Sequence, residues 1–262
     1  MADSVPIDWT KKYPHLSAAP IVEAVIHWQA RAERPWNPEE LRAELTKHLP
    51  EYTKLEAQHQ HEILFALEGS VEGPASSSTS SQRVGWHGFR LSTADGLYIA
   101  QFVRDGLVFS RLRPYQDWPT FEAEGRRLWR LFIELAAPSQ IQRLGVRFIN
   151  RIPIRAGARA GDYLRDPPTR PLSLPLKNFL YLSTFDIPDH DFGIDLVKTL
   201  QSSGCEGNLT SNLIVDIDVF TKQPMPYDEN RIDDRLPRMR TLKNAVFFSL
   251  LTDEAIASFH QK

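Results

Sequence analysis

The sequence has only one cysteine, Cys205, among its 262 residues. A single thiol cannot form an internal disulfide, and it excludes a zinc site built from several thiolates. The first residues also lack the basic stretch followed by an apolar stretch that marks a secretory leader. These absences predict a reduced, cytoplasmic protein.

An excess of charge of either sign is missing as well. The chain carries 31 Lys and Arg against 33 Asp and Glu, which gives a formal net charge of -2. No whole-molecule field therefore attracts it to nucleic acid or to an anionic membrane. Hydrophobic residues make up 42% and the mean hydropathy is -0.36, values that are typical of globular proteins and exclude a membrane bundle. We expect no membrane partner, and any binding of nucleic acid has to be local.

The motifs of several common enzyme classes are also absent. The sequence has no Gly-x-Gly-x-x-Gly, no Walker loop and no Gly-x-Ser-x-Gly. These motifs bind dinucleotides, cradle phosphates or present a nucleophilic serine, so the corresponding functions have no support. No cofactor is expected.

Hydrophobic spacing and turn residues predict the order of the helices and strands. Asn37 is a favourable N-cap before Pro38, and the leucines that follow repeat every four residues, which predicts a short helix. The longest apolar stripe predicts a helix over 119–136, and similar spacing predicts helices near the C-terminus. Asp-Gly pairs at 95–96 and 105–106 predict hairpin turns. The other strands are expected at 21–28, 62–71, 140–154, 179–187, 192–200 and 209–220.

The second half of this order approximately echoes the first, which indicates an internal duplication. We predict an N-terminal arm over 1–19 and a single domain over 20–262, made of two pseudo-repeats at about 20–137 and 140–262. Because hairpins link the strands, the predicted fold class is α+β, with a mostly antiparallel curved sheet and helices packed on one side. The serine-rich segment 73–81 joins two strands and is predicted to be a loop.

Three segments resemble a sporadically distributed prokaryotic family of proteins of about this length. They are PIVEAVI at 20–26, RLGVRFINRI at 143–152 and FFSLLT at 247–252. This chain is similar to the family in three motifs: a Pro-Ile-x-Glu-Ala opening, a central Arg-x-Gly-x-Arg-aromatic-x-Asn block, and a closing block of Phe and Ser/Thr. This chain has Phe148 where the family pattern has tyrosine. The resemblance spans nearly the whole chain and implies one conserved unit, but it supplies no catalytic residues. The patchy distribution of the family favours a mobile or defence-associated gene unit.

A row of arginines follows one face of the central predicted strand. Side chains of a strand alternate between its two faces, so Arg143, Arg147 and Arg151 point one way while Leu144 and Val146 point the other. Arginine, rather than lysine, favours planar recognition of carboxylate or phosphate. The alternative is that these arginines pair with acids on a neighbouring strand.

Two carboxylates on the 209–220 strand could pair with these arginines, or they could bind a metal ion. Asp216 and Asp218 share one strand face, an arrangement by which nuclease and nucleotide-transfer folds hold Mg²⁺. No Gly-Ser motif precedes them and no Glu-x-Lys follows, so no metal site is predicted.

Glu23 and Asn150 lie among apolar neighbours, where an unpaired polar group costs about 1 to 3 kcal/mol. We predict that both have partners, and that Glu23 pairs with an arginine of the row. Arg143, Arg147 and Arg151, with Asn150 and Glu23, are therefore the candidate binding residues.

Three functional hypotheses follow. The first is a non-enzymatic binding or partner protein whose arginine-rich surface takes an anionic ligand, nucleic acid or a protein. The second is a metal-dependent phosphoryl-transfer or nuclease-like enzyme that uses Asp216 and Asp218. The third is a small-molecule sensor that binds between the two halves, in a groove lined by tryptophans such as Trp28, Trp86 or Trp129. The sequence leaves the ligand open, and also whether the chain forms a homo-oligomer.

Overall fold

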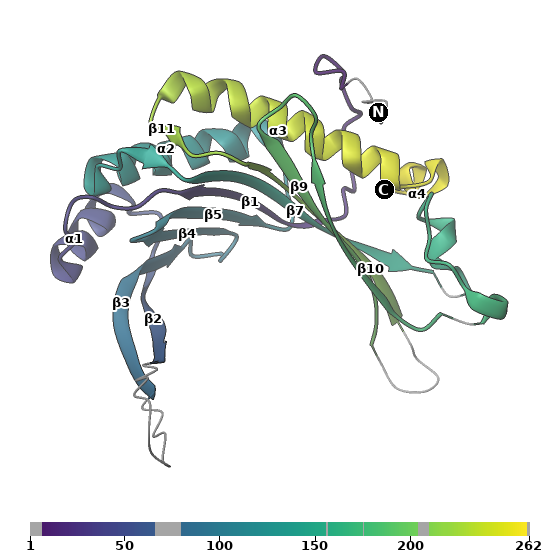
Figure 1. Cartoon of the computed structure of the whole chain (residues 1–262), viewed down its shortest axis with the longest axis horizontal. Helices are drawn as coiled ribbons and strands as arrows, with labels where there is room; N and C mark the ends of the chain where they lie inside the picture. Colours follow the sequence, from purple (N-terminus) through teal and green to yellow (C-terminus); the bar gives the residue numbers. More distant parts are fainter. Residues whose placement is uncertain (1–6, 66–79, 156, 175, 204–209, 261–262) are drawn as a thin grey trace, which may run out of the picture.

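The protein is built on one nine-stranded antiparallel sheet with the strand order β2-β3-β4-β5-β1-β7-β10-β9-β8 (Figure 1). The computed structural model describes residues 7–65, 80–155, 157–174, 176–203 and 210–260. The strands of this sheet are β1 (Ile21–Gln29), β2 (Lys54–Phe65), β3 (Ser80–Ser92), β4 (Tyr98–Val103), β5 (Gly106–Leu112), β7 (Arg143–Ile154), β8 (Phe179–Asp186), β9 (Phe192–Ser203) and β10 (Thr210–Thr221). Two short strands, β6 (Gln140–Ile141) and β11 (Met225–Pro226), pair with each other.

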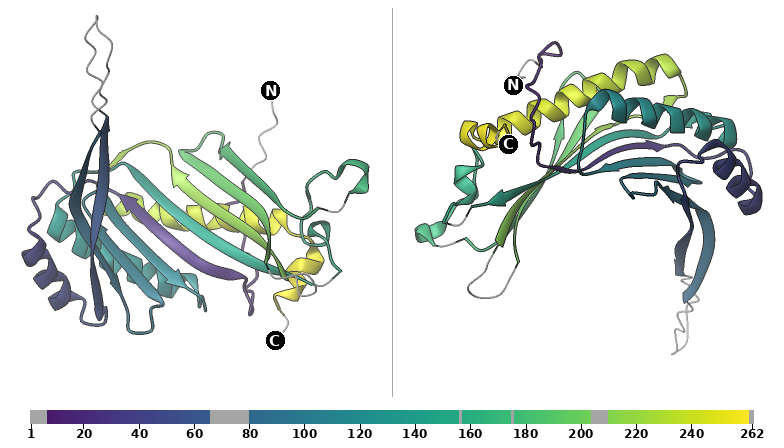
Figure 2. Two further views of the ribbon diagram at one scale, coloured as in Figure 1. Left: turned by 90° about the horizontal axis from the view of Figure 1, so that it is seen from below. Right: turned by 180° about the vertical axis from the view of Figure 1, so that it is seen from behind.

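The helices gather on one side of the sheet. They are α1 (Pro38–His48), α2 (Trp118–Ala136), α3 (Glu229–Leu250) and α4 (Asp253–Ser258). The sheet bends into an arch, α2 and α3 lie along its convex side, and none of these four α-helices lies on the concave underside (Figure 2). We call this underside the open face. The predicted α+β fold, an antiparallel curved sheet with helices on one side, is confirmed. No helix among the described residues is long and apolar enough to cross a membrane.

Side-chain caps explain where the helices begin. The Asn37 side chain accepts a hydrogen bond from the backbone N–H of Glu39 at 2.9 Å, as the sequence predicted. Asp117 does the same for α2, accepting from the backbone N–H of Thr120 at 2.8 Å. The last helix begins after Thr252, whose hydroxyl accepts from the N–H of Ala255 at 3.2 Å.

The hydrophobic core lies between the sheet and its helices. Alternate residues of β1 and β7 point into it, and Trp28, Leu144 and Val146 are fully buried. Trp28 stacks on Trp129 of α2 with ring centroids 5.5 Å apart. Burying side chains of this size contributes about 1.5 to 3 kcal/mol each, so the sheet and helices form one packed unit.

Several predicted boundaries differ from the structure. Strand β2 begins at Lys54, earlier than predicted, because its first half is polar and gives no hydrophobic signal. The predicted serine-rich loop lies mostly outside the described residues, although Ser80 and Ser81 already belong to β3. The strand predicted over 140–154 is interrupted at Gln142, where the chain passes from β6 to β7.

The first strands of the two proposed halves, β1 and β7, are neighbours at the middle of the sheet. They pair antiparallel, with Ile26 opposite Val146 and Trp28 opposite Leu144. This arrangement was expected for a duplicated fold, and the duplication itself stays a prediction.

The N-terminal arm packs against both the helix α3 and the sheet. Tyr13 stacks on Phe248 of α3 with ring centroids 5.1 Å apart, and Trp9 contacts Phe192 of β9. The backbone N–H of Ala18 donates to the carbonyl of Phe259 at 2.8 Å. Residues 7–19 of the arm are therefore part of the folded structure rather than a free tail.

Candidate functional site

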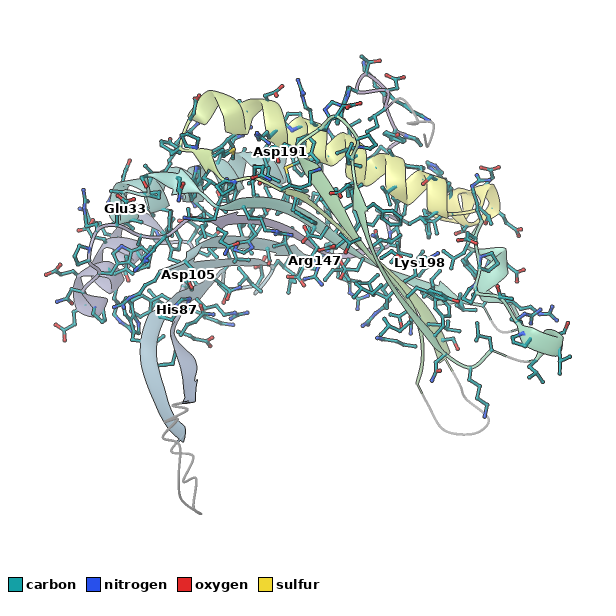
Figure 3. All side chains as sticks on the ribbon, viewed as in Figure 1. Glu33, His87, Asp105, Arg147, Asp191 and Lys198 are labelled. Carbon is teal, nitrogen blue, oxygen red and sulfur yellow. The ribbon has the colours of Figure 1, made fainter. Side chains whose placement is uncertain are left out.

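The arginine row of β7 points to the open face, and its first two members are paired with the neighbouring strand β10. Arg147 binds Asp216 through two hydrogen bonds, Nε to Oδ1 at 2.9 Å and Nη2 to Oδ2 at 2.5 Å. Arg143 donates from Nη2 to Oδ2 of Asp218 at 2.6 Å. The cross-strand pairing considered for these arginines is thus confirmed for both. Figure 3 shows Arg147 on the underside of the arch.

Gly145 leaves room for the Arg143 pair. A Cβ atom at this position would lie 2.6 Å from Nη1 of Arg143 and 3.4 Å from Oδ1 of Asp218. The guanidinium of Arg143 also lies over the ring of Phe220, 4.5 Å from its centroid. The glycine between the arginines therefore allows a planar cation to lie flat against the sheet.

Burial and these pairs change the acidity of the side chains concerned. The hydrogen bond with Asp216 raises the pKa of Arg147. Burial raises the pKa of Asp218, although Arg143 opposes that effect. Burial, with a smaller contribution from Arg143, lowers the pKa of His27 to about 4, so His27 is neutral at pH 7.

The same pairs bear on the metal-dependent alternative. Asp216 and Asp218 each accept hydrogen bonds from an arginine. Across the described ranges, no three His, Cys, Asp or Glu side chains lie close enough together to hold a metal ion. The geometry therefore favours ion pairing over metal binding at these two carboxylates.

Glu23 differs from its predicted role. It lies on the open face and is only half-buried, and among the described residues it forms no ion pair with an arginine, since Arg143 and Arg147 pair with Asp218 and Asp216. Its charge still contributes, after Asp216 and Asp218, to the raised pKa of Arg147. The prediction that Glu23 is a buried partner of an arginine is therefore wrong, because Asp216 already fills that place.

Replacing Glu23 with alanine should change the free energy of unfolding by less than about 1 kcal/mol, since a partly exposed charge without a close partner contributes little. Asp216→Ala is the comparison: it removes both acceptors from Arg147, and should cost about 1.5 to 3 kcal/mol. Urea denaturation of the two variants measures both values. Equal losses would show that Glu23 supports the row as strongly as Asp216 does.

Asn150 lies on the opposite face of β7 from the arginines. It is 2% exposed, and its Nδ2 donates to the carbonyl of Val215 at 3.0 Å. Its predicted need for a partner is confirmed, and strand alternation directs it to the helix side, away from the arginine row. A β-bulge at Val22 shifts the register so that Ile21 stands opposite Asn150.

Asn150 lines a cavity of about 170 Å³, which we call the arm cavity. Its walls come from distant parts of the chain: the arm, the loop that leads into α2, the core side of β7, and one face of α3. The α3 residues follow helical spacing, because positions three, four and seven apart share a face. They are Arg240, Lys243, Asn244, Phe247 and Phe248.

Lys243 is the unusual residue of the arm cavity. Only 9% of its surface is exposed, and its Nζ lies 4.0 Å from the centroid of the Phe148 ring. Throughout the described segments, no carboxylate forms an ion pair with this nitrogen and no acceptor forms a hydrogen bond with it. Burial, together with the charge of Arg240, lowers the pKa of Lys243 to about 7.

Sequence reasoning missed Lys243, although a signal was present. Leu236 and Leu242 belong to the predicted apolar stripe of the last long helix, and both are buried. Lys243 lies seven residues after Leu236, so it falls on the same stripe. A lysine in register with core leucines was the sign of a buried amine.

The tryptophans proposed for a sensor groove lie elsewhere. Trp28 and Trp129 stack together inside the core, and Trp86 packs against Phe89. The arm cavity is lined by Trp118 instead. The guanidinium of Arg240 lies over the Trp118 ring, 5.8 Å from the ring centroid.

Comparison with known proteins adds no assignment. No protein-family model matches this chain, and no curated protein matches it. The family resemblance of the three segments therefore stays a prediction, and the functional argument rests on the geometry of the two faces.

Proposed function

We propose that this chain is a non-enzymatic binding protein that takes a small organic anion in the arm cavity. The observation that carries the proposal is Lys243, a buried cation-forming group without an acidic partner in the described parts of the chain. An unpaired buried charge is costly, and proteins retain such groups mainly at functional sites. A bound carboxylate or phosphate group would provide the missing counter-charge.

Other lining residues support an anion rather than a cation. Arg240 and His15 add basic groups to the walls. Asp117, the one carboxylate among the described lining residues, already caps α2 through its hydrogen bond with Thr120. A volume of about 170 Å³ suits a small metabolite rather than a polymer.

The position of the cavity fits the sensor hypothesis. Its walls combine the N-terminal arm, the loop before α2 from the first half, and β7 and α3 from the second half. A ligand there would contact both halves and stabilise the folded protein, because binding only to the folded state adds its free energy to stability.

The open face is a weaker candidate for anion capture. Its two best placed arginines, Arg143 and Arg147, are already neutralised by aspartates. Arg151 is exposed on the same face, and a single surface arginine gives little affinity for an anionic partner. This is why the arm cavity, rather than the arginine row, is proposed as the site.

Isothermal titration calorimetry with pyruvate, succinate and inorganic phosphate tests the proposal. At least one probe should bind the wild-type chain, and Lys243→Met should weaken that binding at least about tenfold, since a charge-assisted contact is lost. Lys47→Met is the matched control, because Lys47 is an exposed helical lysine that pairs with Glu44 on α1. Arg151→Ala should leave binding unchanged. If all three probes fail to bind, or if Lys243→Met binds them as well as wild type, the proposal is wrong.

A further inference from the structure

The amine of Lys243 has a second chemical property besides its charge. The Lys243 side chain extends from α3, and its Nζ lies over the ring of Phe148, another residue of the cavity lining. The titratable groups that line the cavity with it come from the surrounding segments: Tyr13, His15, Tyr115, Asp117 and Arg240. None of these forms an ion pair or a hydrogen bond with Nζ in the described ranges, so the nitrogen keeps its lone pair available when it is neutral.

An ordinary lysine is almost fully protonated at pH 7, and a protonated amine is not a nucleophile. Burial lowers the pKa of Lys243 to about 7, so close to half of the molecules carry the neutral amine at that pH. The fraction of neutral amine is then roughly a thousandfold larger than at an exposed lysine.

We propose that Lys243 forms a reversible imine with the carbonyl group of a small aldehyde or 2-oxo acid whose anionic group lies toward Arg240. This inference rests on the proposed function, since it names the class of anion that the arm cavity takes. The Nζ lone pair attacks the carbonyl carbon and a C–N bond forms. The carbonyl oxygen then leaves as water with both hydrogens of the amine, and a C=N bond remains. The step needs no oxidant or reductant.

Two features of the cavity favour such an adduct. Lys243 is only 9% exposed, so little water is available to hydrolyse the imine. The Phe148 ring lies 4.0 Å from Nζ, close enough to stabilise a protonated imine by the same cation–π contact that it makes with the ammonium. Arg240 lies about one turn of α3 before Lys243 and lines the same cavity, so the two side chains can contact the adjacent carboxylate and carbonyl groups of one 2-oxo acid.

Reductive trapping tests the imine. The full chain is incubated with pyruvate and cyanoborohydride at pH 7, and the modified residue is located by peptide mass spectrometry. We expect one N-carboxyethyl group, on Lys243, formed at least about tenfold faster than on any other lysine. Lactate has the same carboxylate but no carbonyl, so it should slow the labelling without forming an adduct.

Calorimetry with pyruvate and no reductant separates the two proposals. If pyruvate binds and Lys243 is not labelled, the imine is wrong and the binding function stands. If pyruvate neither binds nor labels Lys243, while succinate or phosphate binds, the imine is likewise wrong. Labelling spread evenly over surface lysines also overturns it, and the absence of binding by every probe overturns both proposals.

Discussion

Replacing Lys243 with methionine is expected to stabilise the protein at pH 6, by roughly 3 to 5 kcal/mol. The pKa of Lys243 is about 7 in the folded protein, against 10.5 for an ordinary lysine. Below pH 7 the amine is protonated in both states, so the folded protein bears the full cost of the buried charge. Between pH 7 and 10.5 the folded protein has released the proton while the unfolded chain keeps it, and stability rises with pH. Methionine fills similar space without a charge.

The difference in unfolding free energy between wild type and Lys243→Met is therefore predicted to shrink as pH rises from 7 toward 10. Urea denaturation at pH 6, 7, 8 and 9 measures it, and taking the difference removes contributions from other titrating groups. Lys47→Met should follow the wild-type curve, because Lys47 is largely exposed. A difference that stays constant with pH, or a variant less stable than wild type at pH 6, would contradict the assignment of a buried, unpaired amine.

Gly106→Ala is the second change with a large expected effect. Gly106 has φ of 146°, and a Cβ there would lie 2.0 Å from the carbonyl oxygen of Trp28. The close neighbour is backbone of the central strand β1 rather than a movable side chain, so the strands must separate. We expect a loss of roughly 3 kcal/mol or more of unfolding free energy.

Gly96→Ala provides the matched control for this effect. Gly96 also has a positive φ, of 71°, but no atom lies within 4 Å of its added Cβ. Its loss should be about 1 kcal/mol, the cost of the backbone conformation alone. Thermal and urea denaturation of both variants isolate the contribution of close strand approach. Similar losses of unfolding free energy in the two variants would show that β1 can move away from residue 106 at little cost.

These predictions connect stability with function. Among the contacts described, the buried amine of Lys243 gains only the cation–π contact with Phe148, which does not offset the cost of its burial at neutral pH. Proteins commonly lose stability at the residues that bind or react with ligands. Lys243→Met should thus combine a more stable fold with loss of anion binding, and this opposite pair of effects distinguishes a functional residue from a structural one.

Local signals in the sequence were sufficient for much of the fold. Asn37 marks the start of α1 because a cap depends only on its own turn. The Asp95-Gly96 and Asp105-Gly106 pairs lie at the β3–β4 and β4–β5 turns for the same reason. The start of β2 was missed, since its polar first half is stabilised by pairing with β3 rather than by a hydrophobic pattern.

The candidate site was predictable only in part. Strand alternation correctly placed Arg143 and Arg147 on one face, with Asp216 and Asp218 on the strand beside them. The arm cavity was not predictable, because it forms only where the arm, β7 and α3 pack together. These segments are distant in the sequence, and no local sequence pattern indicates their contact. The charge on Lys243 also worked against its detection, since a lysine within a helix is usually assigned to the solvent side.

The central position of β1 has a consequence for how the chain is made. Its two partners in the sheet, β5 and β7, both follow it at long sequence separation, and α3, which completes the arm cavity, follows later still. During synthesis the first strand emerges long before any partner exists, and such non-local pairing slows folding. The central strand therefore stays without its sheet partners while they are still being made, and the cavity forms only once the last long helix has been released.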